Sequence, residues 1–226
     1  MGVLLLLLAV GAGVVLLVAA VIAYRTRRRP LAMGCLAGFA GVVGLYLVAL
    51  VGVSLASPRR VLEQHEVKRF CGFYLDCHLG VSVDEVQTAK TIIHGPFSAQ
   101  PKGTFYIVTL RVSSNAVRAT LEPWNLVARV VDEKGRRYGR NRDAERALFG
   151  READRPLEER VAAGGAYTRR LVFDVPDDAR TPALAVTEEG FPDALIEGFL
   201  IGDEDSFLHR PTLLALSSSA SLGARH

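Results

Sequence analysis

The chain has 226 residues, half of them hydrophobic, with 27 basic and 24 acidic side chains and a formal net charge of +3. Four arginines between two uncharged stretches account for the excess, and the other 23 basic residues nearly balance the acidic ones, which all follow residue 62. This near-neutral remainder offers no basic surface for a phosphate backbone, so we exclude nucleic acid as an expected partner.

Two transmembrane helices are predicted near the N-terminus, at about residues 2–24 and 31–57, with an arginine-rich loop at residues 25–30. A helix rises about 1.5 Å per residue, so about 20 apolar residues cross a hydrocarbon core of about 30 Å. Both stretches reach that length without a charged side chain inside the apolar run. Residues 1–57 are therefore predicted to form a transmembrane helical hairpin.

The loop between these helices sets the expected orientation. It carries four arginines, Arg25, Arg27, Arg28 and Arg29. Basic loops stay in the cytoplasm, and long domains translocate largely regardless of their charge. Although basic residues near 59–69 nearly balance the loop, we predict a multi-pass protein of the bacterial cytoplasmic membrane. Its large C-terminal domain would be extracytoplasmic.

Two other interpretations of the N-terminal region remain open. A cleaved signal peptide normally begins with a basic segment, which this chain lacks, but the small residues around Ala23 are compatible with cleavage. The run at residues 31–35, which ends at Cys35, faintly resembles a lipobox, but its hydrophobic segment follows the cysteine instead of preceding it. A retained first helix is the simplest interpretation.

Small residues in the second helix point to close helix packing. Gly34 and Gly38 form a Gly-x-x-x-Gly pattern, which lets helix backbones approach closely in lipid. One interpretation is oligomerisation or docking on another membrane protein. The favoured interpretation is that the two helices of the hairpin pack on each other, because such patterns are common in transmembrane helices.

After the membrane region, the pattern changes from helix to strand. Residues 58–78 are predicted to form a stalk and a cysteine segment, with a short helix over residues 61–69. Residues 79–216 are predicted to form an antiparallel β-sandwich, because short alternating strands are separated by turn residues. The strands are expected at residues 79–86, 104–112, 124–132, 136–138, 167–175, 183–187, 194–201 and 207–216. Residues 141–149 have helical composition, and residues 217–226 are expected to be a disordered tail.

Three motifs in this region resemble a known family. They are residues 103–115 (GTFYIVTLRVSSN), residues 132–138 (DEKGRRY) and residues 171–176 (LVFDVP), the last preceded by a glycine pair. They are similar to motifs of the telokin-like, immunoglobulin-like domain of unknown function on bacterial lipoproteins and anchored proteins. The resemblance covers about residues 79–216 and implies an extracytoplasmic immunoglobulin-like sandwich without catalytic residues. The cysteine segment and the insert at residues 141–160 depart from the family's pattern.

The segment at residues 65–78 holds the most distinctive chemistry. Cys71 and Cys77 are close enough in sequence to form a disulfide if the chain between them turns back, and outside the cytoplasm such a pair is oxidised. The alternative is a copper or zinc site formed by His65, Cys71, Cys77 and His78, with His94 or His209 as a further ligand. Imidazole and thiolate suit either metal.

No catalytic motif is present in the sequence, and we expect neither an enzyme nor a cofactor. The acidic run at residues 202–206 lacks calcium-loop spacing and is interpreted as a turn. The fold class is mainly β, with the helical hairpin in front. The expected function is that of a membrane-anchored binding or structural module, whose partners are the lipid bilayer and another membrane or cell-envelope protein. The alternative is an extracytoplasmic metal-handling protein.

Overall fold

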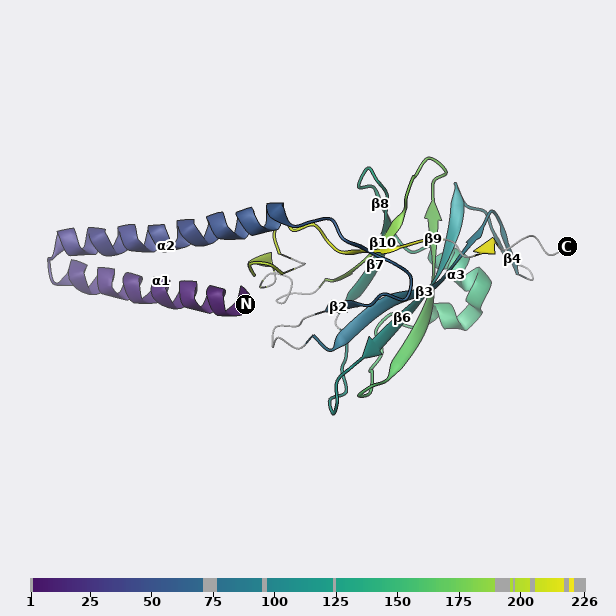
Figure 1. Ribbon diagram of the computed structural model, residues 1–226, viewed down its shortest axis with the longest axis horizontal. Coiled ribbons are helices and arrows are strands. Elements are labelled where there is room, and N and C mark those ends of the chain that lie inside the picture. Colours follow the sequence, from purple (N-terminus) through teal and green to yellow (C-terminus); the bar gives the residue numbers. More distant parts are fainter. Residues whose placement is uncertain are drawn as a thin grey trace. The chain divides into compact units, whose positions relative to one another are not determined.

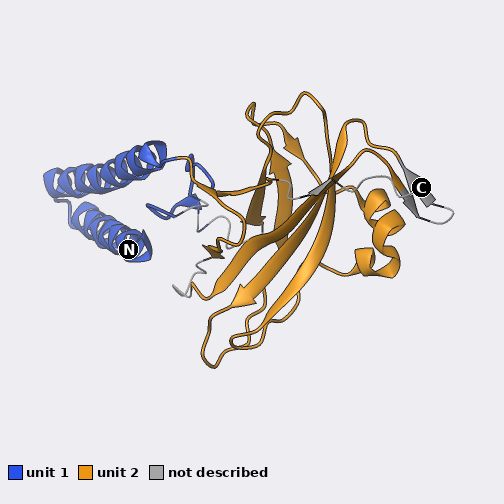
Figure 2. Cartoon of the chain, turned by 45° about the vertical axis from the view of Figure 1, so that its right-hand side comes forward, with its two compact units in different colours: residues 1–58, 191–211 blue, residues 59–190, 212–226 orange. Residues whose placement is uncertain are grey.

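The computed structural model describes residues 2–70, 77–94, 97–123, 125–189, 196, 198–203, 206–217 and 220–221. The chain divides into two compact units (Figure 2). The first contains residues 1–58 and 191–211, and the second contains residues 59–190 and 212–226. The chain therefore leaves the second unit after residue 190 and returns to it at residue 212.

The first unit is built on two long helices that lie side by side, α1 (Gly2–Arg25) and α2 (Arg29–Ala56) (Figure 1). They agree with the predicted ranges to within two residues at each end. The turn between them is short, and the Thr26 hydroxyl donates a hydrogen bond of 2.9 Å to the Ile22 carbonyl at the end of α1. All four predicted loop arginines lie at this turn or directly beside it.

Glycines let the two helices approach each other, but only one of them is a predicted one. At Gly38 a Cβ atom would lie 3.5 Å from a methyl group of Leu16, and at Gly13 it would lie 3.2 Å from the ring of Phe39. At Gly34 a Cβ would meet no atom within 4 Å. The close contacts therefore lie at Gly13 and Gly38, whereas Gly34, one turn before Gly38 on the same face of α2, has open space beside it.

The apolar side chains of the hairpin are mostly exposed. In the most apolar 18-residue window of each helix, 11% of α1 and 6% of α2 is buried. A core helix of a soluble protein would be mostly buried, so these are not core helices of this chain. Their length and composition suit membrane spans, and a signal sequence at an N-terminus has the same properties.

The second unit is a β-sandwich of two five-stranded sheets, together with a hairpin of β4 (Ile92–His94) and β5 (Phe97–Ala99). Sheet A has the order β1-β11-β10-β7-β8. Its strands are β1 (Val61–Leu62), β11 (Leu213–Ala215), β10 (Ala183–Glu188), β7 (Leu126–Val131) and β8 (Arg137–Tyr138). All its pairs are antiparallel except β1 with β11.

Sheet B is built around two eleven-residue strands, β3 (Leu79–Ala89) and β6 (Thr104–Ser114). Its other strands are β9 (Ala166–Val175), which pairs with β6, and β2 (Lys68–Phe70) and β12 (Ala220–Ser221), which pair with β3. The residues of β6 are β-branched or aromatic at most positions, which favours a strand. Val108, Leu110 and Val112 of β6 are completely buried in the main core between the sheets.

A second apolar cluster covers part of the outer face of sheet B. Helix α3 (Arg142–Phe149) and the 3-10 helix η1 (Gly150–Asp154) follow β8. The cluster consists of Ala89, Ile92, Phe105, Ile107, Ala144, Ala147 and Val172. The Asn141 side chain caps α3 by accepting the Ala144 N–H at 3.0 Å, and Gly150 ends the helix at φ +55°. The helix predicted over residues 141–149 is therefore confirmed, with a side-chain cap at its start and a glycine at its end.

Most of the strands predicted from the alternation are confirmed, but the stalk is not a helix. Residues 61–62 and 68–70 form strands β1 and β2 of the sandwich, which begins at residue 59 instead of 79. Lys68 and Phe70 are 2% and 5% exposed, whereas Arg69 between them is exposed, so the segment alternates like a strand. Pairing with β11 and β3 overrides its helical composition.

Three further expectations near the C-terminus differ from the structure. In the predicted strand at residues 194–201, the described residues Ile196 and Gly198 are helical and the chain belongs to the helical unit. The second predicted strand at 207–216 is reduced to β11. In the predicted disordered tail, Ala220 and Ser221 pair with Gln87 and Thr88 of β3, because that edge of β3 is open beyond β2.

Candidate functional site

Among the described residues, only about half of the outer face of sheet B is covered by α3. Helix α3 lies over Phe105, Ile107 and Val172, but at the opposite end of the strands the same face carries polar side chains. In this half Ser82 of β3 pairs with Arg111 of β6, and Glu85 pairs with Thr109. We call this part of the sheet the open face; its residues are Asp84, Glu85, Gln87, Thr109, Arg111 and Arg170.

A β-bulge shapes the open face. The register of β3 against β6 shifts between Val83 and Glu85, so Asp84 is the extra residue. Val83 and Val86 both remain in the core, and two consecutive carboxylates are presented at the strand's surface. Bulges commonly re-aim side chains in this way beside functional sites. Arg111 lies 4.0 Å from Asp84 across the strands.

Two open hollows lie on this face. The first is lined by Glu85, Gln87, Ile107, Thr109, Leu148, Phe149 and Arg170. The second is lined by His65, Val67, Ser82, Asp84, Arg111 and Ser113. Arginines and carboxylates alternate along the face, which suits contact with a polar surface of mixed charge more than with a single anion or cation.

Arg170 connects the open face to α3. Its guanidinium lies 4.2 Å from the centre of the Phe149 ring and pairs with Glu152 at 2.5 Å. Both contacts hold the arginine at the rim of the first hollow. Arg170 is therefore a polar group in a fixed position at that rim.

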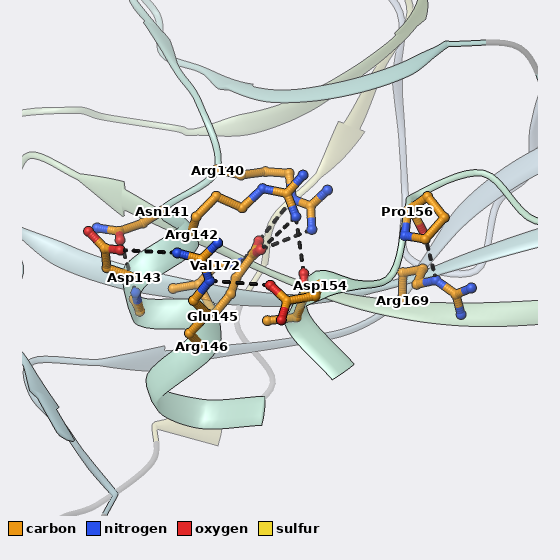
Figure 3. A network of polar contacts seen from close by, with 12 residues as sticks. Arg140, Asn141, Arg142, Asp143, Glu145, Arg146, Asp154, Pro156, Arg169 and Val172 are labelled. Atoms are coloured by element: carbon orange, nitrogen blue, oxygen red, sulfur yellow. Dashed lines mark hydrogen bonds and ion pairs between the residues drawn. The ribbon is translucent and has the colours of Figure 1, made fainter. Parts of the chain in front are cut away.

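A buried carboxylate fixes α3 on the sheet (Figure 3). Glu145 is completely buried, and Arg140 donates to its two oxygens from Nε and Nη2, each at 2.9 Å. Arg142 lies 3.6 Å from the same carboxylate. The Asn141 N–H donates to the Val172 carbonyl at 2.7 Å, so the segment also pairs with the edge of β9. These contacts determine where the covered half of the face ends.

A second buried carboxylate closes the β7–β8 turn. Asp132 accepts hydrogen bonds from the backbone N–H groups of Lys134 and Arg136, from Arg136 Nε and from the Tyr138 hydroxyl. Burial alone would raise the pKa of Asp132, but these hydrogen bonds lower it from 3.8 to about 2. Gly135 in the same turn has φ +75°, as a short hairpin loop requires. The turn is a structural element rather than a reactive one.

The predicted cysteine–histidine site is only partly described. Cys71 lies outside the described residues, so the Cys71–Cys77 disulfide stays a prediction. His78 is exposed, and its Nδ1 lies 2.7 Å from the side-chain amide of Asn115. His65 lies instead in the second hollow, with φ +67° and its N–H bonded to the Val83 carbonyl. Although Ser82 lines the same hollow, no hydrogen bond joins it to His65.

The metal alternative gains no support from the described residues. Within them, no group of three or more histidine, cysteine or carboxylate side chains is placed to hold a metal ion. His209 belongs to the helical unit, whereas His65 and His78 belong to the sandwich unit. Of the acidic turn, Glu204 and Asp205 lie outside the described residues, while Gly202 has the φ of +81° typical of a turn.

Comparisons with known proteins find distant structural likenesses but no family. No family model matches the chain, and no curated protein matches it. The yjhA protein from Bacillus subtilis is 13% identical, covering 70% of this chain and 100% of that chain at a TM-score of 0.41. The secreted protein MPT63 from Mycobacterium tuberculosis is 15% identical, with coverages of 61% and 95% and a TM-score of 0.40.

An uncharacterized β-sandwich protein from Clostridium difficile 630 is 9% identical, covering 59% of this chain and 92% of that chain at a TM-score of 0.32. Likenesses at these scores support no conclusion about fold, family or activity. The open face was missed by the sequence reasoning. A signal was present, because Asp84 and Glu85 interrupt the alternation of Val81, Val83 and Val86, as expected at a bulge.

Proposed function

We propose that this protein is a membrane-anchored, non-enzymatic module that presents the open face of sheet B to another protein of the bacterial cell envelope. One observation carries the proposal. A single chain joins two bilayer-length helices, whose apolar side chains are exposed, to a sandwich with an uncovered polar sheet face. The exposed apolar surface of the helices suits a lipid environment. The polar sheet face can act by contact with another protein, without catalytic residues.

The arginine turn and the motifs supply the finer parts of the proposal. The four arginines between α1 and α2 favour a cytoplasmic turn and an extracytoplasmic sandwich. The telokin-like motifs support an immunoglobulin-like assignment of the sandwich. Within the proposal the cytoplasmic membrane holds the chain in a multi-pass arrangement, and the bilayer is its first partner.

Anchoring and orientation are tested in native membranes. The full chain is expected to remain in the membrane fraction after carbonate extraction, and release into the supernatant would contradict anchoring. Val117, which is 87% exposed in the sandwich, and Thr26 in the turn are replaced by cysteine in separate variants. In intact spheroplasts, a membrane-impermeant maleimide should label V117C more strongly than it labels the parent chain. T26C should be labelled only after lysis, and the reverse pattern would contradict the orientation.

The open face is tested by photo-cross-linking. A photoreactive amino acid replaces Thr109, in the middle of the face, and a matched variant carries it at Val117. The Thr109 variant should give a discrete adduct with an envelope protein that the Val117 variant does not give. Identical adduct patterns for the two positions would exclude the open face as the contact surface.

A further inference from the structure

A segment near the C-terminus is fastened to the helical hairpin rather than to the sandwich. The described residues 198–203 and 206–210, here called the hairpin segment, belong to the same compact unit as α1 and α2. The segment closes on itself, because the Phe207 N–H donates to the Gly198 carbonyl at 2.8 Å. It is therefore a compact loop and not an extended linker.

Three hydrogen bonds attach the hairpin segment to α2 and its end. The Tyr46 hydroxyl donates to the Phe199 carbonyl at 2.6 Å, and the hydroxyls of Ser54 and Ser206 lie 3.1 Å apart. The Arg210 N–H donates to the Ser57 hydroxyl at 3.1 Å. Ser54 is completely buried and Ser206 is 5% exposed, so the attachment excludes water. These bonds satisfy polar groups that would otherwise be costly at the end of an apolar helix.

Helix α1 supports the same loop. A Cβ atom on Gly2 would lie 2.8 Å from the Ile201 carbonyl oxygen and 3.3 Å from the Leu200 Cβ. The start of α1 therefore packs directly on the backbone of the hairpin segment. Leu200 is 4% exposed, so the loop has one apolar side chain directed into the unit.

Three other large apolar side chains of the loop are exposed. Phe199 is 46% exposed, Phe207 66% and Leu208 51%. Phe199 also lines an apolar groove with Leu6, Val10, Val43, Tyr46 and Leu47 on the surface of the helices. The exposed surface of the loop is thus continuous with the apolar surface of α1 and α2.

The length of α2 places this loop at a definite depth. Its 28 residues rise about 42 Å, which exceeds a hydrocarbon core of about 30 Å by roughly 12 Å. Counted from Arg29 at the arginine turn, Tyr46 lies at about 26 Å and Ser54 at about 38 Å. Tyr46 is then just inside the hydrocarbon boundary, and Ser54 lies at the level of the headgroups. The hairpin segment spans the distance between them.

We propose that the hairpin segment is a membrane-interface anchor that inserts Phe199, Phe207 and Leu208 at the boundary between headgroups and acyl chains. Aromatic side chains are enriched at this level of membrane proteins. This inference rests on the proposed membrane anchoring of the hairpin. The acidic residues in the sequence of the loop, Asp203, Glu204 and Asp205, do not attract anionic headgroups. Insertion is therefore apolar and independent of lipid charge.

The test uses the full chain reconstituted into phosphatidylcholine vesicles whose acyl chains are brominated close to the headgroups. Bromine quenches tryptophan only by close contact, and the signal of the single native Trp124 is subtracted. F207W and F199W report on the loop in separate variants. L45W, at a site 74% exposed on α2, reports on the hairpin, and V117W reports on the solvent-exposed sandwich.

The brominated lipid is expected to quench F207W and F199W by as large a fraction as it quenches L45W. The fluorescence of V117W should not be quenched. Addition of anionic lipid should leave these losses unchanged. If L45W is quenched but both loop variants behave like V117W, the loop is covered by protein or water and the inference is wrong, while anchoring stands. If L45W is not quenched either, the proposed anchoring fails as well.

Discussion

The carboxylate of Glu145 accepts a hydrogen bond of 3.1 Å from the backbone N–H of Val172, in the edge strand β9. The neighbouring Asn141 N–H donates to the carbonyl of the same residue. At this point the edge of sheet B is therefore closed by the segment that leads into α3. An open edge offers unpaired backbone groups to other chains, so this closure limits aggregation as well as positioning the helix.

Glu145→Ala is expected to destabilise the full chain by about 3 kcal/mol, because it leaves the guanidinium of Arg140, which is 14% exposed, without its buried partner. The free energy of unfolding of the sandwich is measured by chemical denaturation in detergent. Glu122→Gln removes an exposed pair with Arg160 and should change it by less than about 0.5 kcal/mol. Equal effects of the two variants would contradict a buried ion pair.

Gly103 permits a close approach of two backbones. A Cβ there would lie 2.2 Å from the Val175 carbonyl oxygen, so Gly103→Ala is expected to destabilise the sandwich by roughly 1–3 kcal/mol. At Gly139 a Cβ meets no atom within 4 Å, and Gly139→Ala should be close to neutral. The same denaturation experiment compares both variants. A neutral G103A would show that β6 and β9 separate easily at this end.

The low pKa of Asp132 predicts a loss of stability in acid. Because its pKa in the folded state is about 2, below the ordinary 3.8, its contribution is present above pH 4 and is lost as the pH falls towards 2. Asp132→Asn should lower the midpoint of denaturation at pH 7, and its difference from the parent should shrink between pH 4 and pH 2. Asp143→Asn, with a side chain 94% exposed, is the control. A pH-independent difference for D132N would contradict this account.

Charge reversal on the open face should affect binding without affecting folding. The Arg111 side chain is 50% exposed and its nearest carboxylate oxygen is 4.0 Å away, so Arg111→Glu should change the stability by less than about 0.5 kcal/mol. It should nevertheless weaken or remove the adduct formed from Thr109. Arg160→Glu, exposed elsewhere on the sandwich, should leave that adduct intact. Loss of the adduct in both variants would point to a general effect of charge.

The helix contact in the hairpin is tested by oxidation in membranes. In a chain with Cys35 replaced by alanine, cysteines at positions 16 and 38 should cross-link readily, because Gly38 packs on Leu16. Cysteines at positions 16 and 34 should not, since Gly34 has no neighbour within 4 Å. The loss of maleimide labelling measures each yield. The opposite order of yields would restore Gly34 as the packing glycine.

Local patterns were sufficient for much of the fold. The apolar lengths predicted α1 and α2, alternation predicted β3, β6, β9 and β10, and the composition of residues 141–149 predicted the helix α3. Each of these signals lies within a few consecutive residues. The stalk was predicted wrongly because its conformation is set by pairing with other strands: β1 pairs with the distant β11, and β2 pairs with β3. A composition rich in glutamate and lysine carries no information about such partners.

The candidate site could be predicted from the sequence less well than the fold. The open face depends on how β3, β6 and β9 pair, and on where α3 stops covering them. The bulge at Asp84 was visible as broken alternation, but its partner Arg111 follows from register alone. The hairpin segment was mistaken for a strand, since Phe199, Leu200 and Ile201 are as apolar as a core strand. Only their contacts with Gly2 and Tyr46 distinguish them.

The parallel pairing of Val61 with Leu213 has a consequence for biosynthesis. The strand β1 cannot find its neighbour until the ribosome has made the chain through residues 213–214, about 150 residues later. By then α1 and α2 have long left the ribosome, so we expect the hairpin to reach its destination before the sandwich closes. A chain that ends before β11 would leave β1 without its neighbour and the edge of β10 uncovered, an exposed edge that favours aggregation.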